Sequence, residues 1–276
     1  STWQKTTLAK GSSYSLPGVR DAEGYTFMGW STKPMQSVSP QYEAEEKITV
    51  NGNVDLYAVV FNRTTETDLT EDQLPQVDIY KYKQVIFVGD SRTEFMENVL
   101  TGMGESATKN VKFVCSAGKG LDWFTTTGWA QLYSIVQHDS NSILSKKTAV
   151  IFNFGVNDLS KSADYAEYYN WIAPQLKSKG CELYFMSVNP VNRLMLPNAG
   201  RADRSEAAVR SFNQYMKANL SSAYTYIDMY SYLKSTGYSF ASDHYGTGTV
   251  DDGLHYTTRT YKRIFAKCMD SLRVPA

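Results

Sequence analysis

The sequence lacks an excess of charge of either sign. Its 28 lysine and arginine residues equal its 28 aspartate and glutamate residues, which gives a formal net charge of zero. No run of basic residues forms a stripe that could follow a phosphate backbone, so nucleic acid is not expected as a partner. The longest apolar stretch, residues 148–154, is far shorter than the roughly 20 residues that cross a bilayer. We therefore expect a soluble protein without a membrane span.

Cysteine and histidine are both scarce, with three residues of each. The cysteines are widely spaced, without a CxxC pair or a Cys/His cluster, which excludes a disulfide framework and a zinc site of the usual kinds. We interpret Cys115, Cys181 and Cys268 as buried apolar residues. The chain begins STWQKTT, without a methionine or an apolar signal segment, which is typical of a trimmed or mature form.

Composition divides the chain into three parts. Residues 1–62 are typical of a small β-rich domain, and residues 63–79 are rich in Thr, Asp and Glu with almost no large apolar side chains. Such a composition predicts a linker. Core-forming sequence resumes after it, so we expect a larger domain over residues 80–276.

Within the first part, turn residues separate short β-prone segments. The hairpin signal Asn51-Gly52 stands between two of them. The predicted strands are residues 25–28, 48–50 and 54–59.

From residue 80 onward, β-branched runs alternate with segments of helical spacing. Apolar residues three and four apart predict helices over 165–176, 209–220 and 261–272. This βαβα order predicts an α/β fold, a flavodoxin-like three-layer sandwich with a five-stranded parallel sheet. In such folds the site lies at the carboxyl ends of the strands. The predicted strands are residues 84–88, 111–115, 148–154, 181–188 and 224–227.

The first candidate motif, Gly89-Asp90-Ser91-Arg92, follows the first of these strands and opens a predicted helix. Backbone N–H groups at a helix start are unpaired and can stabilise a developing oxyanion. Ser91 is therefore a candidate nucleophile, although serine also caps helices without any catalytic role.

Two further motifs follow the next two predicted strands. Residues 116–120, SAGKG, contain glycines whose N–H groups can approach a ligand closely. Asn157, within the motif GVND, can supply a neutral amide donor to an oxyanion. Each motif is also common as an ordinary turn, so neither is specific by itself.

The fourth motif is Asp252-Gly253-Leu254-His255. A general base must be one of three histidines, and His255 alone has an aspartate three residues upstream on what should be one compact turn. Asp252 could hold the imidazole with its other nitrogen toward the serine. His138, at the polar end of a predicted helix, is expected to be solvated, and His244 is the alternative base.

Together and in this order, the four motifs resemble the sequence blocks of the SGNH/GDSL hydrolases over residues 84–260. The resemblance implies that Ser91 is the nucleophile and that Asp252 and His255 complete a catalytic triad. It also implies an oxyanion hole built from the Ser91 N–H, Gly120 and Asn157.

Two positions leave this resemblance open in detail. The second block contains GKG, so Gly118 is an alternative to Gly120. Arg92 stands where many members have leucine. That difference bears on the substrate class and not on the chemistry.

The N-terminal part has a resemblance of its own. The sequences GYTFMGWST at residues 24–32 and ITVNGNVDLYAV at residues 48–59 resemble the Listeria–Bacteroides surface repeat, with valine in place of the usual final tryptophan. The resemblance implies a secreted or bacterial cell-surface location, with cell-wall association through flanking domains. Trp30 and Tyr57 are expected to form the small core of this unit.

The implied activity is that of a secreted serine esterase that acts through an acyl-enzyme and needs no metal or organic cofactor. An exported chain with many Tyr and Trp residues suits a carbohydrate surface, so we expect short acyl esters, O-acetyl groups on polysaccharide above all, as substrates. Acylated small molecules remain possible substrates. Aromatic residues that could line a sugar groove, although such residues usually belong to the core, are Tyr80, Tyr82, Trp123, Trp129 and Trp171.

Three alternatives share much of this sequence pattern. A lipase, lysophospholipase or thioesterase would use the same residues on a longer acyl chain. An O-acetyltransferase would pass the acyl group to a sugar hydroxyl instead of water. A non-catalytic adhesin or glycan-binding module would be expected to lose a triad or oxyanion residue, and here each is present.

Overall fold

The computed structural model describes residues 4–78, 81–138, 147–196, 204–241 and 252–273. Five parallel strands form the main sheet in the order β6-β5-β7-β8-β9. Each coincides with a predicted run to within a few residues, so the expected fold class is confirmed. The strands are β5 (Tyr82–Gly89), β6 (Val111–Cys115), β7 (Lys147–Asn153), β8 (Cys181–Met186) and β9 (Tyr224–Ile227).

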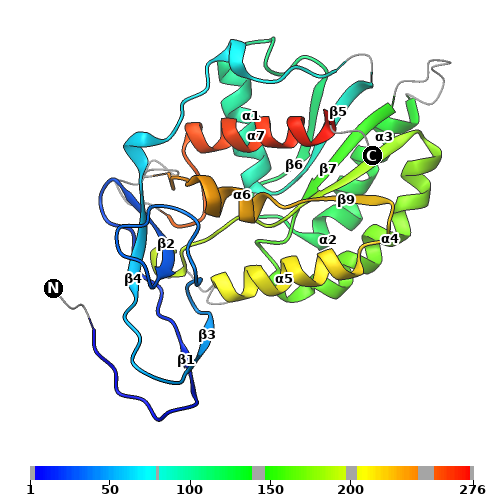
Figure 1. The fold of residues 1–276 in the computed structure, drawn as a ribbon. Helices are drawn as coiled ribbons and strands as arrows, with labels where there is room; N and C mark the ends of the chain where they lie inside the picture. Colours follow the sequence, from blue (N-terminus) through cyan, green and yellow to red (C-terminus); the bar gives the residue numbers. More distant parts are fainter. Residues whose placement is uncertain (1–3, 79–80, 139–146, 197–203, 242–251, 274–276) are drawn as a thin grey trace.

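Helices cover both faces of this sheet, with α1 and α7 on one side and α4 and α5 on the other (Figure 1). Side chains of β5 alternate between the two faces, since Ile86 and Val88 belong to one buried cluster and Val85 and Phe87 to the other. The helices are α1 (Ser91–Met103), α2 (Leu121–Trp123), α3 (Trp129–His138), α4 (Ser162–Ser178), α5 (Glu206–Asn219), α6 (Met229–Thr236) and α7 (Thr258–Arg273).

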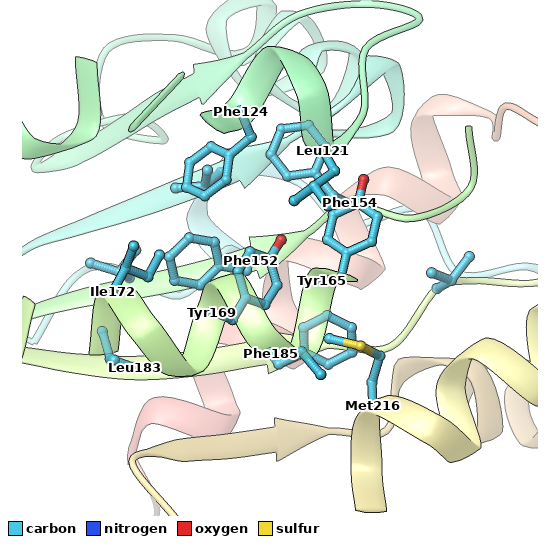
Figure 2. Packing of buried hydrophobic residues seen from close by; sticks show 14 of the residues in the cluster. Leu121, Phe124, Phe152, Phe154, Tyr165, Tyr169, Ile172, Leu183, Phe185 and Met216 are labelled. Carbon is cyan, nitrogen blue, oxygen red and sulfur yellow. The ribbon is translucent and has the colours of Figure 1, made fainter. Parts of the chain in front are cut away.

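Aromatic side chains fill the core on the α4 side of the sheet (Figure 2). The ring of Phe152 on β7 lies with its centroid 4.8 Å from that of Tyr169 on α4 and 5.7 Å from that of Phe124. All three side chains are buried. Ring pairs at such separations add to the large gain from burying aromatic surface.

The N-terminal part contains two antiparallel ribbons instead of the predicted hairpin. Strand β1 (Ser12–Ser15) pairs with β3 (Lys47–Val50), and β2 (Tyr25–Ser31) pairs with β4 (Tyr57–Asn62). The hairpin expected at Asn51-Gly52 is therefore wrong, and the strand predicted from residue 54 begins at Tyr57. The chain bends at Gly52, but the strands on either side of this bend pair with β1 and β2 and not with each other.

The small core of this unit surrounds Trp30. Its ring lies 5.4 Å from that of Phe27, centroid to centroid, and its Nε1 donates to the Pro17 carbonyl at 2.8 Å. Trp30 is buried as expected, but Tyr57 is 43% exposed and does not belong to that core.

The β-rich unit and the α/β unit share one buried cluster. Met28, Val59 and Phe61 pack together with side chains of β5, α1 and α7. Polar contacts join the same units, since Lys234 on α6 donates to the Met28 carbonyl at 2.6 Å and lies 2.9 Å from the Glu43 carboxylate. The N-terminal unit is thus packed on the α/β unit through both apolar and charged contacts.

The segment predicted as a linker also packs against the α/β unit. It contains the 3-10 helices η1 (Arg63–Thr65) and η2 (Glu71–Gln73), and Leu74 and Val77 are buried. The Glu66 carboxylate is fully enclosed and accepts a hydrogen bond from Arg263 on α7 at 2.8 Å. This buried ion pair between Glu66 and Arg263 joins the segment to α7.

Cys181 and Cys268 are buried as expected, whereas Cys115 is only half-buried at the end of β6, so the expectation is wrong for that residue. Within the described ranges, no helix combines the length and apolar character that crossing a membrane requires.

Gly237 tests the packing between the two units. Its φ is +87°, and a Cβ there would lie 2.3 Å from the Phe61 ring. We predict that Gly237→Ala lowers the free energy of unfolding by about 3 kcal/mol, because strain and overpacking add. Urea denaturation measures this. Gly11→Ala is the control, since Gly11 has φ +81° with no atom within 4 Å of such a Cβ, and equal losses in both variants would contradict the packing argument.

Candidate active site

Three of the four motifs meet at one edge of the sheet. Gly89, the last residue of β5, pairs in register with Cys115 at the end of β6 and Asn153 at the end of β7. Because the strands are parallel, the segments that follow them leave the sheet at the same edge. Ser91, the SAGKG segment and the GVND segment therefore start from adjacent positions.

Ser91 is the first residue of α1. The side chain of Asp90 caps the helix by accepting the Arg92 N–H at 3.0 Å. Gly89 must be glycine, since a Cβ there would lie 2.0 Å from the Thr93 hydroxyl. The sharp passage from strand to helix leaves the serine at the positive end of α1.

The structure brings Ser91, His255 and Asp252 together. Ser91 Oγ lies 2.9 Å from His255 Nε2, and His255 Nδ1 lies 2.5 Å from Asp252 Oδ2. The ring of Phe95, one helical turn after the serine, meets the imidazole edge-on at 4.7 Å between centroids. These contacts place a nucleophile, a base and a carboxylate in one hydrogen-bonded chain.

The turn from Asp252 to His255 is closed by its own hydrogen bonds. Asp252 Oδ1 accepts the backbone N–H groups of Leu254 at 2.8 Å and His255 at 2.7 Å. Burial alone would raise the pKa of Asp252, but hydrogen bonds from the His255 ring and from these N–H groups outweigh it and lower the pKa below its usual value. The carboxylate stays ionised and can hold the imidazole in one tautomer.

Asp158 of the GVND motif fastens the glycine segment. Its Oδ2 accepts the Leu121 N–H at 2.9 Å, and its Oδ1 accepts the Tyr165 hydroxyl at 2.7 Å. A Cβ on Gly120 would lie 2.3 Å from Asp158 Oδ2, whereas a Cβ on Gly118 meets no atom within 4 Å. Gly118 has φ +70°, so the two glycines are required for different reasons, and only Gly120 packs against the GVND motif.

The amide of Asn157 is oriented by two partners. Its Nδ2 donates to the Lys119 carbonyl at 2.7 Å, and its Oδ1 accepts a hydrogen bond from the buried Arg204 guanidinium. Arg204 is fixed in turn by donating from Nε to the Val156 carbonyl at 2.9 Å. The arginine fixes which side of the amide carries the oxygen, so the amide nitrogen is directed toward the glycine segment.

Arg92 does not line a substrate surface. Its buried guanidinium donates to three backbone carbonyls, those of Leu254 at 2.9 Å, Asn189 at 2.8 Å and Pro190 at 2.7 Å. The same group lies 5.1 Å from the centroid of the Tyr256 ring. The residue after the serine thus joins α1 to the turn that carries His255.

The other histidines and aromatic residues from the sequence lie elsewhere or cannot be placed. His138 is exposed, as expected, at the last residue of α3. Tyr82 is buried and Trp171 is 59% exposed on α4, while Trp123 and Trp129 pack partly against the core. His244 and Tyr80 lie outside the described residues.

Arg204 and the role of Asp158 were missed by sequence reasoning. Asp158 could have been suspected, because it follows Asn157 directly, but Arg204 lies 47 residues away and no motif surrounds it. In the part of the chain that the structure covers, no group of three or more His, Cys, Asp or Glu side chains has the arrangement of a metal site.

We predict that Arg92→Leu lowers the free energy of unfolding by about 3 kcal/mol, because buried carbonyls without donors cost roughly 1–3 kcal/mol each. Urea denaturation followed by tryptophan fluorescence measures the change. Arg92→Lys keeps the charge but not the planar guanidinium, and its free energy of unfolding should fall less. A leucine variant as stable as the wild type would show that the three contacts contribute nothing.

Two family models match parts of the chain. The family model of the GDSL-like lipase/acylhydrolases matches residues 85–268, and that of the Listeria-Bacteroides repeat domain matches residues 1–59. No curated protein sequence matches the chain significantly.

Solved structures with a similar fold include an acetyl xylan esterase, with 11% identity over 69% of this chain and 100% of that one and a TM-score of 0.45. The catalytic domain of peptidoglycan O-acetyltransferase A from Streptococcus pneumoniae shares 17% identity over 69% and 92% of the two chains, with a TM-score of 0.39. A protein from Bacillus subtilis shares 14% over 86% and 71%, with a TM-score of 0.42. By its family match, this chain belongs to the GDSL-like lipases and acylhydrolases and carries a carboxylic ester hydrolase domain.

Proposed function

We propose that the protein is a secreted serine esterase that hydrolyses short acyl esters, O-acetyl groups on carbohydrate in particular. The observation that carries the proposal is the hydrogen-bonded chain from Ser91 Oγ through the His255 ring to Asp252, with separations of 2.9 and 2.5 Å. In this proposal Ser91 is the nucleophile, His255 the general base and Asp252 its orienting carboxylate.

In the acylation step, His255 Nε2 takes the proton of the Ser91 hydroxyl while Oγ attacks the ester carbonyl carbon. The carbonyl oxygen becomes an oxyanion, which the N–H groups of Ser91 and Gly120 and the Asn157 amide stabilise. When the tetrahedral intermediate collapses, the carbon–oxygen bond to the alcohol breaks. The alcohol leaves with the proton from His255, and the acyl group stays on Ser91.

In deacylation, His255 takes a proton from water, and the resulting hydroxide attacks the acyl-enzyme. The carboxylic acid leaves and Ser91 recovers its proton. Asp252 remains ionised throughout, in keeping with its lowered pKa. The imidazolium that forms in each step therefore always has a carboxylate beside it.

Close packing around the serine favours a small acyl group. Ser91 is 4% exposed and His255 1% exposed, and Phe95 packs against the imidazole. We infer that an acetyl group needs less rearrangement of these side chains to bring its carbonyl carbon to Oγ than a long acyl chain does. The packing is the structural argument for short esters over the lipid and thioester substrates of a lipase or thioesterase.

The proposed location rests on the N-terminal match. Repeats of the Listeria-Bacteroides type match residues 1–59, and such repeats are typical of bacterial surface proteins. A surface location makes esters on cell-wall or environmental polysaccharides the accessible substrates.

Hydrolysis of p-nitrophenyl esters from acetate to octanoate tests the activity. We predict that acetate is preferred and that Ser91→Ala loses activity at least about a thousandfold, because the nucleophile is removed. Ser160→Ala, at an exposed serine, is the matched control and should keep full activity. Preference for octanoate would favour a lipase or thioesterase.

Equal inactivity of wild type and Ser91→Ala toward all esters would contradict the esterase proposal. Adding an oligosaccharide acceptor then distinguishes a transferase, which acetylates the sugar, from a binding module, which does not.

A second prediction separates the two glycines of the oxyanion segment. We predict that Gly120→Ala lowers kcat for acetate about a hundredfold, since its Cβ would displace the Asp158 carboxylate and with it the donors of the oxyanion hole. Gly118→Ala strains the backbone, but its Cβ would meet no atom within 4 Å. Its kcat for acetate should therefore fall far less. A larger loss at Gly118 would assign the oxyanion donor there. Steady-state kinetics on both variants gives the answer.

A further inference from the structure

We propose that Asn192 is a positioning residue through which the N-terminal β-rich unit holds the Asp252–His255 turn against Ser91. The inference rests on the proposed function, because it concerns the geometry of the same triad. It assigns residues 1–62 a role in catalysis, beyond spacing the enzyme from a surface.

The loop from Asn189 to Asn192 packs against the turn that carries Asp252 and His255. The Asn192 backbone N–H donates to the Gly253 carbonyl at 2.8 Å. Gly253 has φ +65°, and a Cβ there would lie 2.4 Å from the Asn192 carbonyl oxygen. Backbone therefore packs directly on backbone, between the acid and the base of the triad.

The side chain of the same asparagine reaches into the N-terminal unit. Its Nδ2 donates to the Val19 carbonyl at 2.9 Å and to Asp21 Oδ1 at 3.1 Å. The Asp21 carboxylate also accepts the Phe27 N–H at 2.8 Å and pairs with Arg63 at 2.6 Å. Asp21 thus joins the start of β2, the end of β4 and Asn192.

Arg92 holds the other end of the loop through the carbonyls of Asn189 and Pro190. The loop is therefore fixed on one side by the nucleophile helix and on the other by the N-terminal unit. A shift of the Asn192 end would move Gly253 and carry Asp252 and His255 with it. Displacements of about 1 Å at a reacting group can cost a hundredfold in rate.

The test removes the donors of Asn192 without changing its shape. Asn192→Asp is isosteric but places a second carboxylate beside Asp21. We expect kcat per active serine, counted by titration with a phosphonate ester, to fall about tenfold with KM for p-nitrophenyl acetate unchanged. Glu23→Gln, at an exposed acid of the same unit, is the control and should match the wild type.

Restoring one donor–acceptor pair should rescue the rate. The double variant Asp21→Asn with Asn192→Asp places an amide opposite a carboxylate again, and we expect it to recover at least threefold in kcat over Asn192→Asp. A merely structural role would lower the number of titratable sites and leave kcat per site unchanged. That result, or a double variant without recovery, would overturn the inference.

A readout without turnover separates this inference from the proposed function. In the wild type and in Ser91→Ala, the proton on His255 Nδ1 should give a downfield NMR signal protected from solvent exchange, because it is buried against Asp252. Asn192→Asp should weaken that protection. If the enzyme proves inactive on every ester, the proposed function fails while this signal still decides the inference; equal protection in Asn192→Asp and wild type would overturn it.

Discussion

The parallel pairing of β5 with both β6 and β7 is the constraint on which the rest of the site depends. Gly89 pairs with Cys115 on one side and with Asn153 on the other. The loops that follow β5, β6 and β7 therefore begin at the same edge of the sheet. Hydrogen bonds between those loops then complete the arrangement, with Asp158 joining the third loop to the second. A slip of one residue in either pairing would turn every side chain of the strand to the opposite face.

Much of the α/β unit could be predicted from the sequence, because its strands are short, apolar and separated by amphipathic helices. Residues 111–115 and 224–227 were predicted with the bounds that β6 and β9 have. The motifs around Ser91 and His255 were equally visible, since each is local and each follows or precedes a predicted element. The local hydrophobic pattern predicted an element correctly wherever its apolar face is also the face that the fold buries.

The N-terminal unit was predicted less well, and the reason is physical. Its strand pairing depends on contacts distant in sequence, as between β1 and β3, and a turn signal such as Asn51-Gly52 carries no information about them. The polar segment before β5 had the composition of a linker, yet Glu66 is buried because Arg263, 197 residues later, supplies its charge partner. The sequence could not predict Arg204, Asn192 or the carbonyl partners of Arg92 either. Each of these contacts joins residues that lie far apart in the chain.

The candidate triad joins positions 164 residues apart, and the contacts behind it reach from Asp21 to Asn192, a separation of 171 residues. Early and late parts of the chain must both be in place before the serine meets its base. During synthesis, the chain therefore carries no assembled pair of Ser91 and His255 until its last part has been made. The order of synthesis and the completion of folding thus set the earliest moment at which the serine can meet its base.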